Sequence, residues 1–484
     1  MAVVACCWGE VMASSLAVGP DKPYRTIASA LAVAADADII EVDAGVYVND
    51  YCVVRQHNLT IRGKGGRAHI SANGLIPNGK GIILQRGRNL TLENLELSGA
   101  AVADQNGAGY RCDNGGSNVV IRHCYFHHNE NGILLGIIDP NNEVLIENSE
   151  FAYNGSGTGQ THNIYVGHVK KFTLRFSYSH DANVGHLVKS RANENFILYN
   201  RLTGENGTNS YEIDLPNGGN SYIVGNVIQQ SPRSENGGFI SYAREVNAAN
   251  AWNPGRECYV INNTMVNDRS QGCFVMYHKD TALVKLQNNI FAGSATLYDS
   301  PGGMAPERVS NLIVNSDPGF VNRSAFDYHL TSSTIAAIDQ GTAPGMANGF
   351  NLTPAYEYEH VALSSPRPAA IKIDIGAHEF SLNGEDEGED ETEKVHAYPN
   401  PYWPGSGGRY DGSGVVFSNL PISAKIQIYT IHGTLLRTLE SSSERRTCTW
   451  DGLTTGGDAV ASGVYFVRVE GSGRVQTLKV VVQR

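Results

Sequence analysis

Short stretches in which apolar and polar residues alternate recur along the first three quarters of the chain. Each repeat holds two or three such stretches, separated by turns rich in Asn and Gly, and repeats follow one another at intervals of about 25 residues. Clear examples are 118–126 with 131–135, 143–151 with 162–166, and 195–202 with 210–214. Alternation with a period of two is typical of strands with one buried face. The pattern predicts an all-β fold, a right-handed parallel β-helix in which each turn packs on the next.

The third stretch of each repeat sets which residues face outward. We place one apolar residue of each stretch in the core: Ile164, Val188, Ile213 and Ile240. The residue after each of them then faces outward on neighbouring turns: Tyr165, Lys189, Asp214 and Ser241. A slip of one residue would bury the charges of Lys189 and Asp214, which is costly, so we expect this register.

Charged residues two positions after Lys189 and two positions before Asp214 extend the outward face. We therefore expect a mixed cluster made of Lys189, Arg191, Glu212 and Asp214. The turn before contributes Tyr165, His162 and His168. His186 begins the Lys189 strand, and the turn after contributes Tyr242, Arg244 and Glu245. We expect the remaining histidines, such as His123, His127 and His128, to occupy turns or stacked polar ladders.

The ends of the repeat array differ from its middle. Residues 1–16 are apolar and small, which indicates a leader or the remnant of a signal peptide, although the positive start of such a signal is missing and a simple first cap is the alternative. Residues 17–382 form the predicted β-helix, opened by a capping helix over Asp21–Ala35. An acidic linker follows over 383–395, and short, evenly spaced strands over 396–484 predict a small immunoglobulin-like β-sandwich.

Composition and charge narrow the function classes. The 484 residues include 53 glycines, as expected for a turn-rich β protein, and carry a net charge of −11. Segment 383–394 holds seven acidic residues and one lysine, so the rest of the chain is nearly balanced at −5. The chain lacks the overall basic charge of nucleic-acid binders and any apolar stretch long enough for a transmembrane helix. The eight cysteines form no CxxC pair, so they predict no zinc site.

Two motifs near the start and one near the end of the β-helix resemble a known group of proteins. Gly19–Ile27 followed by Ala44–Tyr47 is similar to the opening of pectinesterase-like and pectate-lyase-like proteins. Asp374–Glu379 resembles the closing turns of secreted bacterial members. The resemblance implies an extracellular protein that acts on a polysaccharide. The catalytic motifs of pectinesterases and polygalacturonases are missing, so it implies the fold more firmly than the reaction.

The C-terminal stretch resembles a different family. Ala397–Pro401, Ser462–Arg468 and Leu478–Arg484 are similar to the sorting domains of type IX secretion and to flagellar-hook-cap immunoglobulin-like domains. This resemblance implies a partner in the secretion machinery and a secreted or cell-surface location. An accessory β-sandwich is the alternative, and we expect a monomer.

The mixed cluster suits β-elimination on an anionic, uronate-containing polysaccharide. That reaction needs a base and a cation that neutralises the uronate carboxylate, and Lys189 and Arg191 are expected to share these roles. A second cation nearby lowers the pKa of a lysine, which favours a base. We expect Tyr165 or His186 to protonate the leaving oxygen, and His162, His168, Tyr242, Arg244 and Glu245 to bind substrate. Glu212 and Asp214 are candidates for Ca²⁺.

Other functions fit the same residues. A glycoside hydrolase would use two of the carboxylates, chosen from Asp181, Glu212, Asp214 and Glu245. A non-catalytic β-helix that binds glycans at the cell surface needs no catalytic group at all. Finally, Lys189, Arg191 and Asp214 are also the residues of a surface salt-bridge ladder that only stabilises neighbouring turns.

Overall fold

The computed structural model divides the chain into two compact units, Met1–Ser381 and Leu382–Arg484. The residues that the structure describes are 13–113, 115–248, 250–380, 395–405, 412–421, 423–430, 434–441, 446–471 and 474–484. The first twelve residues and the acidic segment 383–394 therefore lie outside the described part, and the predictions made for them stay predictions.

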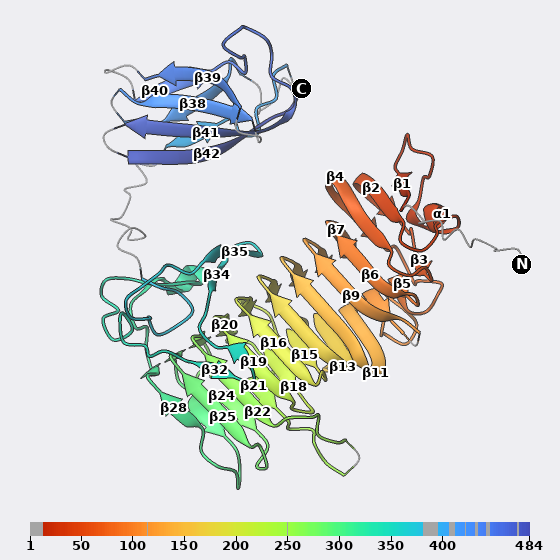
Figure 1. The fold of residues 1–484 in the computed structure, drawn as a ribbon, viewed down its shortest axis with the longest axis vertical. Helices are drawn as coiled ribbons and strands as arrows, with labels where there is room; N and C mark the ends of the chain where they lie inside the picture. Colours follow the sequence, from red (N-terminus) through yellow and green to blue (C-terminus); the bar gives the residue numbers. More distant parts are fainter. Residues whose placement is uncertain are drawn as a thin grey trace, which may run out of the picture. The chain divides into compact units, whose positions relative to one another are not determined.

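The first unit is a parallel β-helix, as predicted (Figure 1). Each turn adds one strand to each of three parallel ladders. The first ladder contains β1 (Ser15–Val18), β2 (Ile39–Val48), β4 (Thr60–Ser71), β6 (Arg88–Glu93), β9 (Ser117–Arg122), β11 (Asn131–Glu147), β13 (Ile164–Arg175), β16 (Glu194–Leu198), β19 (Asn220–Val224), β22 (Glu257–Ile261), β25 (Leu283–Gln287) and β28 (Glu307–Val309).

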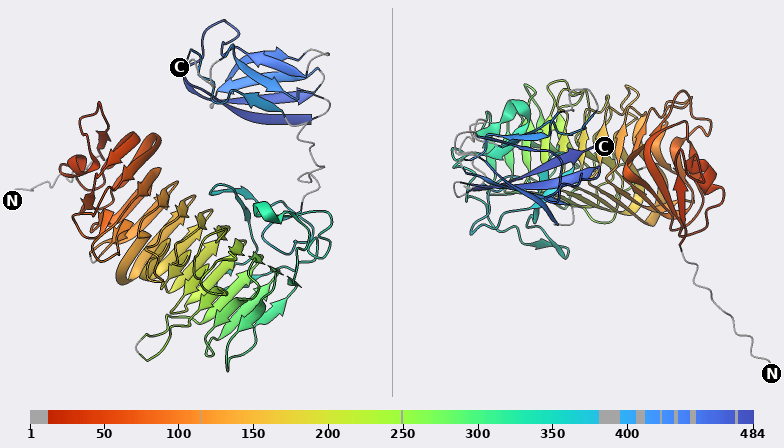
Figure 2. Two further views of the ribbon diagram at one scale, coloured as in Figure 1. Left: turned by 180° about the vertical axis from the view of Figure 1, so that it is seen from behind. Right: turned by 90° about the horizontal axis from the view of Figure 1, so that it is seen from above.

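The other two ladders run beside it along the unit (Figure 2). The second ladder begins in the last residues of β2 and β4 and continues through β7 (Leu95–Ser98), β10 (Tyr125–His127), β12 (Glu150–Ala152), β14 (Tyr178–His180), β17 (Arg201–Thr203), β20 (Val227–Gln230), β23 (Thr264–Asn267), β26 (Ile290–Ala292) and β29 (Leu312–Val314). The third contains β3 (Cys52–Val54), β5 (Gly81–Gln85), β8 (Ala108–Cys112), the first residues of β11 and β13, β15 (Val188–Ser190), β18 (Ile213–Leu215), β21 (Gly238–Tyr242), β24 (Cys273–Tyr277) and β27 (Thr296–Asp299).

A short helix covers the first turn. Helix α1 (Ile27–Leu31) is shorter than the predicted Asp21–Ala35, because Thr26 caps it and the chain leaves the helix after Leu31. The buried Asp50 carboxylate accepts hydrogen bonds from the backbone N–H groups of Ile27 and Ala28, which anchors the helix start. Strand β1 pairs with β2 from Ser15 onward, so the β-helix takes in the last residues of the stretch predicted as a leader.

Buried asparagines stack at the tight turn between the first and second ladders. Asn226 Nδ2 donates to Asn263 Oδ1 at 2.9 Å, and Asn226 Oδ1 accepts from Asn200 Nδ2 at 3.0 Å. Asn263 in turn donates to Asn289. The residues just before them, such as Tyr199 (φ 55°), take the left-handed conformation that the sharp turn requires. This is the stacked ladder that the repeated Asn in the sequence indicates.

The β-helix closes with small antiparallel hairpins instead of further parallel strands. They are formed by β30 (Phe320–Asn322) with β31 (Asp327–Leu330), β32 (Met346–Ala347) with β33 (Phe350–Asn351), and β34 (Tyr356–Glu359) with β35 (Leu363–Pro366), with a 3₁₀ turn η1 at Arg323–Ala325. Asn262 Nδ2 donates to Asp374 O, so the closing segment is bonded to the last turns. Among the described residues, no helix is long and apolar enough to cross a membrane.

The second unit is built from two antiparallel sheets. One contains β36 (His396–Tyr398), β37 (Val415–Ser418) and β40 (Thr447–Trp450); the other has the order β39 (Leu435–Glu440), β38 (Lys425–Thr430), β41 (Gly463–Gly471) and β42 (Arg474–Val482). Both sheets contribute to one hydrophobic core, in which Trp450, Phe417 and Ile426 are fully buried. The predicted small β-sandwich is therefore confirmed, with its own core.

Candidate functional site

The third ladder has the predicted register. Tyr165 lies beside Lys189, Lys189 beside Asp214, and Asp214 beside Ser241 on successive turns. The apolar neighbours of these residues belong to the core, where Val188, Ile213 and Ile240 are fully buried. The pattern of the sequence thus identified the core residues of this strand and the neighbours of Lys189 correctly, although Lys189 and Asp214 are themselves buried.

Lys189 forms the centre of the mixed cluster. Its Nζ lies 2.8 Å from Asp214 Oδ2 and 2.9 Å from Glu245 Oε1. Burial alone would lower the pKa of Lys189, but the two carboxylates outweigh it and raise that pKa. Lys189 is therefore an ammonium at neutral pH. The expectation that a neighbouring cation would lower its pKa is wrong, because the carboxylates lie closer than sequence spacing indicates.

Arg191 distributes its donors over three partners. Its Nε donates to the Tyr165 hydroxyl at 3.2 Å, one terminal nitrogen to Asn217 Oδ1 at 2.5 Å, and the other to Glu245 Oε2 at 2.6 Å. Glu245 thus bridges Arg191 and Lys189 through its two oxygens. Burial would raise the pKa of Glu245, but the two cations dominate and lower it. With 42% of its side chain exposed, Glu245 is the most accessible charged group of the cluster.

Two buried histidines stack along the edge of the cluster. The rings of His162 and His186 lie 4.7 Å apart, and His186 stacks on Tyr211 at 5.1 Å. Burial and then the charge of Lys189 lower the pKa of His186 to about 3, and burial and His186 lower that of His162 far below its usual value. Both rings are therefore neutral at physiological pH. Their burial leaves little surface for a substrate, in contrast to the binding role expected for His162.

The expected pair of carboxylates for Ca²⁺ does not form. Glu212 is fully buried and accepts hydrogen bonds from Asn209 Nδ2 at 3.0 Å and Gln230 Nε2 at 3.2 Å. Asp214 instead binds the Lys189 ammonium. The prediction that Glu212 faces outward beside Asp214 is wrong, because Glu212 lies at a bend just before β18 and its carboxylate is held by buried amides. A cation held 2.8 Å from Asp214 already supplies its positive partner, so these residues do not fit a Ca²⁺ ion.

The other residues expected to bind substrate are distributed differently. Tyr242 is fully buried and donates its hydroxyl hydrogen to Gly219 O at 2.7 Å, so its assignment to substrate is wrong. Arg244 forms an ion pair at 3.2 Å with Asp299, which lies on β27, two turns further along the β-helix. His168 is half-buried, and burial followed by the charge of Arg191 lowers its pKa. The exposed part of the cluster thus consists of Tyr165, Arg191 and Glu245, with Lys189 behind them.

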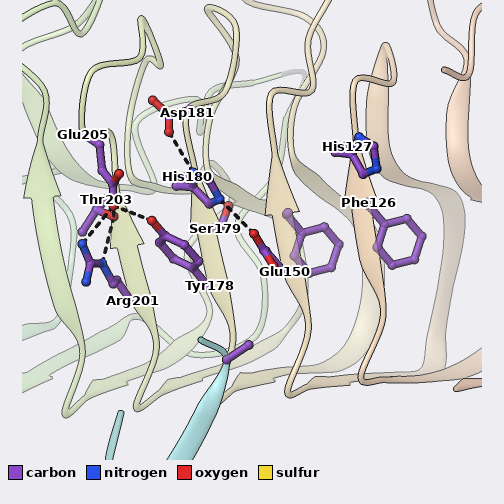
Figure 3. A network of polar contacts seen from close by, with 12 residues as sticks. Phe126, His127, Glu150, Tyr178, Ser179, His180, Asp181, Arg201, Thr203 and Glu205 are labelled. Atoms are coloured by element: carbon purple, nitrogen blue, oxygen red, sulfur yellow. Dashed lines mark hydrogen bonds and ion pairs between the residues drawn. The ribbon is translucent and has the colours of Figure 1, made fainter. Parts of the chain in front are cut away.

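A second polar face, on the second ladder, was not anticipated. This face lies on three-residue strands whose central residues point into the core. The rings of two of these central residues, Phe126 and Phe151, stack with their centres 5.1 Å apart. Figure 3 shows the polar groups that flank this core row on neighbouring turns. They come from β10, β12, β14 and β17 and from the turns that follow these strands: His127, Glu150, Tyr178, His180, Asp181, Arg201, Thr203 and Glu205.

Two linked networks hold this face. Glu205 accepts hydrogen bonds from the Tyr178 hydroxyl, from Arg201 at 2.9 Å and from Thr203 at 3.1 Å. His180 Nδ1 lies 2.8 Å from Asp181, and its Nε2 lies 3.4 Å from Glu150. Burial would lower the pKa of His180, but these two carboxylates raise it. The network therefore holds three carboxylates against two basic side chains, and each of these groups already has a partner within it.

The sequence carries a signal for this face in the strand that follows the tight turn, and the pattern of the third strand does not contain it. After each buried Cys, Ser or Asn of the tight turn comes the same three-residue strand, as in 125–127, 150–152, 178–180 and 201–203. The outer positions of that strand hold Tyr, Glu, His and Arg in place of the apolar residues of a buried strand. Aligning this strand in the same way would have shown the row.

Comparisons with solved structures give several similarities. The chain is 13% identical to the pectate lyase Pel9A, with a TM-score of 0.46 over 77% of this chain and 98% of that one. It is 11% identical to the pectin methylesterase of Aspergillus niger, with a TM-score of 0.28 over 66% and 89%. PorZ, an essential surface component of the type-IX secretion system of Porphyromonas gingivalis, is 26% identical over 27% of this chain and 15% of its own length, with a TM-score of 0.17. No family model and no curated protein matches the chain, so its function is argued from the site itself.

Proposed function

We propose that the first unit binds an acidic, uronate-containing polysaccharide at the third ladder and cleaves it by β-elimination. The observation that carries the proposal is the carboxylate of Glu245, which bridges Lys189 Nζ and the Arg191 guanidinium at 2.9 and 2.6 Å. Two fixed cations with this spacing recognise a carboxylate. A uronate carboxylate offers them the same group.

The charge of the cluster supports an exchange of carboxylates. Lys189 and Asp214 neutralise one another, so Glu245 neutralises the charge of Arg191. When Glu245 moves aside, the cluster keeps one net positive charge. The carboxylate of the incoming uronate then takes the place of the Glu245 carboxylate. Glu245 follows β21 in an exposed turn, whereas Asp214 is buried within β18, so Glu245 is the partner that can leave.

Tyr165 is the group best suited to carry the proton. Lys189 and Arg191 are both charged at neutral pH and therefore cannot act as the base, in contrast to the roles first expected for them. Arg191 Nε donates to the Tyr165 oxygen and holds that oxygen beside the two cations. In the proposed elimination, the oxygen of Tyr165, having given up its own proton to solvent, takes the proton on the carbon next to the carboxylate. The bond to the leaving oxygen then breaks, a carbon–carbon double bond forms, and Tyr165 returns the proton to that oxygen.

Incubation with a panel of uronate polymers tests this proposal. The expected result is absorbance from the unsaturated product, with Tyr165→Phe losing turnover but retaining binding, and Arg191→Gln losing both. Arg308→Gln is the control, because it removes the same charge from an exposed position on β28. Reducing ends without that absorbance would indicate a hydrolase instead. Binding without any product would indicate a glycan-binding protein, and neither binding nor product would contradict the proposal.

We also propose that the second unit directs the protein to the cell exterior through a secretion partner. The support is the sequence of Leu478–Arg484, which begins within β42, together with a β-sandwich that has its own core. Fusing 395–484 to a reporter enzyme in a bacterium with type IX secretion tests it. Reporter activity outside the cells is expected, and retention of the fusion inside would contradict it.

A further inference from the structure

Two histidines and a glutamate converge on three successive turns of the second ladder. His69 lies on β4 and is the register partner of Glu96 on β7. His127 lies one turn further, on β10, opposite Ser98. One possible ligand atom of each of the three residues lies within 4.8 Å of the other two. The three side chains are only 16–25% exposed, so they are close to solvent but held in place.

The distances within the cluster match metal coordination. Glu96 Oε1 lies 3.1 Å from His127 Nε2 and 3.4 Å from His69 Nδ1. Ligand atoms around a tetrahedral Zn²⁺ at bond lengths of 2.0–2.1 Å are separated by about 3.3 Å. Two of the three separations therefore already have the value that a bound ion would impose.

The opposite nitrogen of each ring has its own partner. His69 Nε2 lies 2.7 Å from the Ser98 hydroxyl, and His127 Nδ1 lies 2.8 Å from His128 Nδ1. With the protons on these two nitrogens, both imidazoles turn an unprotonated nitrogen toward Glu96. Such outer partners fix the ring orientation of metal-binding histidines. Tyr125 stacks on His127 with the ring centres 4.3 Å apart and restricts that ring further.

The neighbouring cluster of His180, Asp181 and Glu205 shows what a saturated group looks like. Its Glu205 already accepts from Arg201, Tyr178 and Thr203. His180 lies between two carboxylates. Among the described residues, no lysine or arginine lies within ion-pair distance of Glu96, whose close neighbours are the two histidines. Of the two clusters, the one around Glu96 is therefore the better candidate, because no basic side chain already neutralises its carboxylate.

We propose that His69, Glu96 and His127 bind a divalent transition-metal ion of the Zn²⁺ type. Two imidazole nitrogens and one carboxylate oxygen are ligands that such an ion prefers over Ca²⁺, which favours oxygen alone. Three protein ligands leave a fourth position open to solvent or to a ligand. The site lies on a different ladder from Lys189 and does not depend on the proposed lyase activity. It uses histidine, so the cysteine pattern gave no indication of it.

Titration calorimetry of the full chain with Zn²⁺, and separately with Ca²⁺, tests the proposal. One equivalent of Zn²⁺ is expected to bind, and Ca²⁺ is not. Glu96→Gln and His127→Gln are each expected to weaken Zn²⁺ binding at least tenfold. His123→Gln is the matched control, since His123 is exposed at the start of the turn that leads into β10.

Two further readouts separate a built site from loose surface binding. Co²⁺ bound to the wild type is expected to give the visible spectrum of a four-coordinate ion, and Zn²⁺ is expected to raise the thermal midpoint of the wild type but not of Glu96→Gln. The proposal is overturned if the wild type binds no Zn²⁺, if both ligand variants bind as tightly as His123→Gln, or if Ca²⁺ binds instead.

Discussion

The carboxylate of Glu245 lies 2.9 Å from the ammonium nitrogen of Lys189, although the two residues are 56 positions apart in the sequence. The contact is possible because the chain makes two turns of the β-helix between them, from β15 through β18 to β21. Glu245 then reaches back from the turn after β21. An exposed carboxylate thus lies over a buried cation that already has a second partner, Asp214.

Replacing Glu245 by Gln is expected to strengthen binding of uronate oligomers. The substitution removes the carboxylate that competes for Lys189 and Arg191, while its length stays the same. A hydrogen bond between charged groups contributes about 1.5–3 kcal/mol, so we expect about tenfold tighter binding, or about 1.4 kcal/mol. Calorimetry with a galacturonate or alginate oligomer measures it.

Glu307→Gln is the control for this variant, because it removes the same charge from an exposed position on β28. It is expected to leave the affinity unchanged. Equal affinities for wild type and Glu245→Gln would show that Glu245 does not occupy the carboxylate site.

The fold of the first unit was predictable because a β-helix repeats a local pattern. Apolar residues at every second position identified the buried row Val188, Ile213 and Ile240, and the register followed from the spacing of the turns. The capping helix was overestimated, because apolar Ala residues after Leu31 continue the helical pattern while the chain itself turns away. Ser15 and Leu16 of β1 were assigned to a leader for a similar reason, since a short edge strand and a leader can have the same small and apolar residues.

The candidate site was predictable only in part, because strand register does not determine which side chains meet across a turn. Lys189 and Asp214 were placed together correctly, since they are direct ladder neighbours. Glu212 was misplaced, because the strand begins one residue later and the chain bends before it. The contact of Glu245 with Lys189 depends on the path of an irregular turn, which no periodicity describes.

Removing the charge of Lys189 is expected to destabilise the first unit. Lys189→Met leaves the carboxylate of Asp214, 2% exposed, without its cation. Breaking a buried ion pair in this way costs about 3–5 kcal/mol. Denaturant unfolding of the protein measures this loss of stability. Because the variant is destabilised, its activity has to be compared with the wild type under conditions in which both are folded.

The double variant Lys189→Met with Asp214→Asn is expected to recover much of this loss, because no uncompensated charge stays buried. Lys170→Met is the surface control, since the ion pair of Lys170 with Glu143 is about half exposed, and it should change stability little. If the single and double variants unfold at the same denaturant concentration, the Lys189–Asp214 pair does not have the assigned role.

The asparagine ladder is expected to contribute to stability at each of its steps. Asn226→Ala removes the bonds that Asn226 makes to Asn263 Oδ1 and to Ile197 O, both in the buried turn. A buried group left without its partner costs about 1–3 kcal/mol. The free energy of unfolding is expected to fall by that amount, with a lower unfolding midpoint, whereas Asn73→Ala, at an exposed position, should leave both unchanged. Equal midpoints for the two variants would contradict this role.

The raised pKa of His180 predicts a dependence of stability on pH. A group whose pKa is higher in the folded state stabilises that state fully below its unfolded pKa of about 6.5. The contribution is then lost as the pH rises through the folded value. For His180 the cause is the pair of carboxylates, Asp181 and Glu150, which outweighs burial. The protonated ring should therefore add stability in mildly acidic solution and little above neutral pH.

His180→Asn removes this charge and tests the sign of the effect. The stability difference between wild type and His180→Asn is expected to be larger below about pH 6 than above about pH 8, because only the protonated ring is attracted by both carboxylates. Denaturant unfolding at the two pH values measures it. His123→Asn, at an exposed turn position, should show no such difference. A stability difference between the wild type and His180→Asn that stays constant, or that widens with rising pH, would contradict the prediction. It would mean that His180 is neutral in the folded protein and that Asp181 and Glu150 do not stabilise its protonated ring.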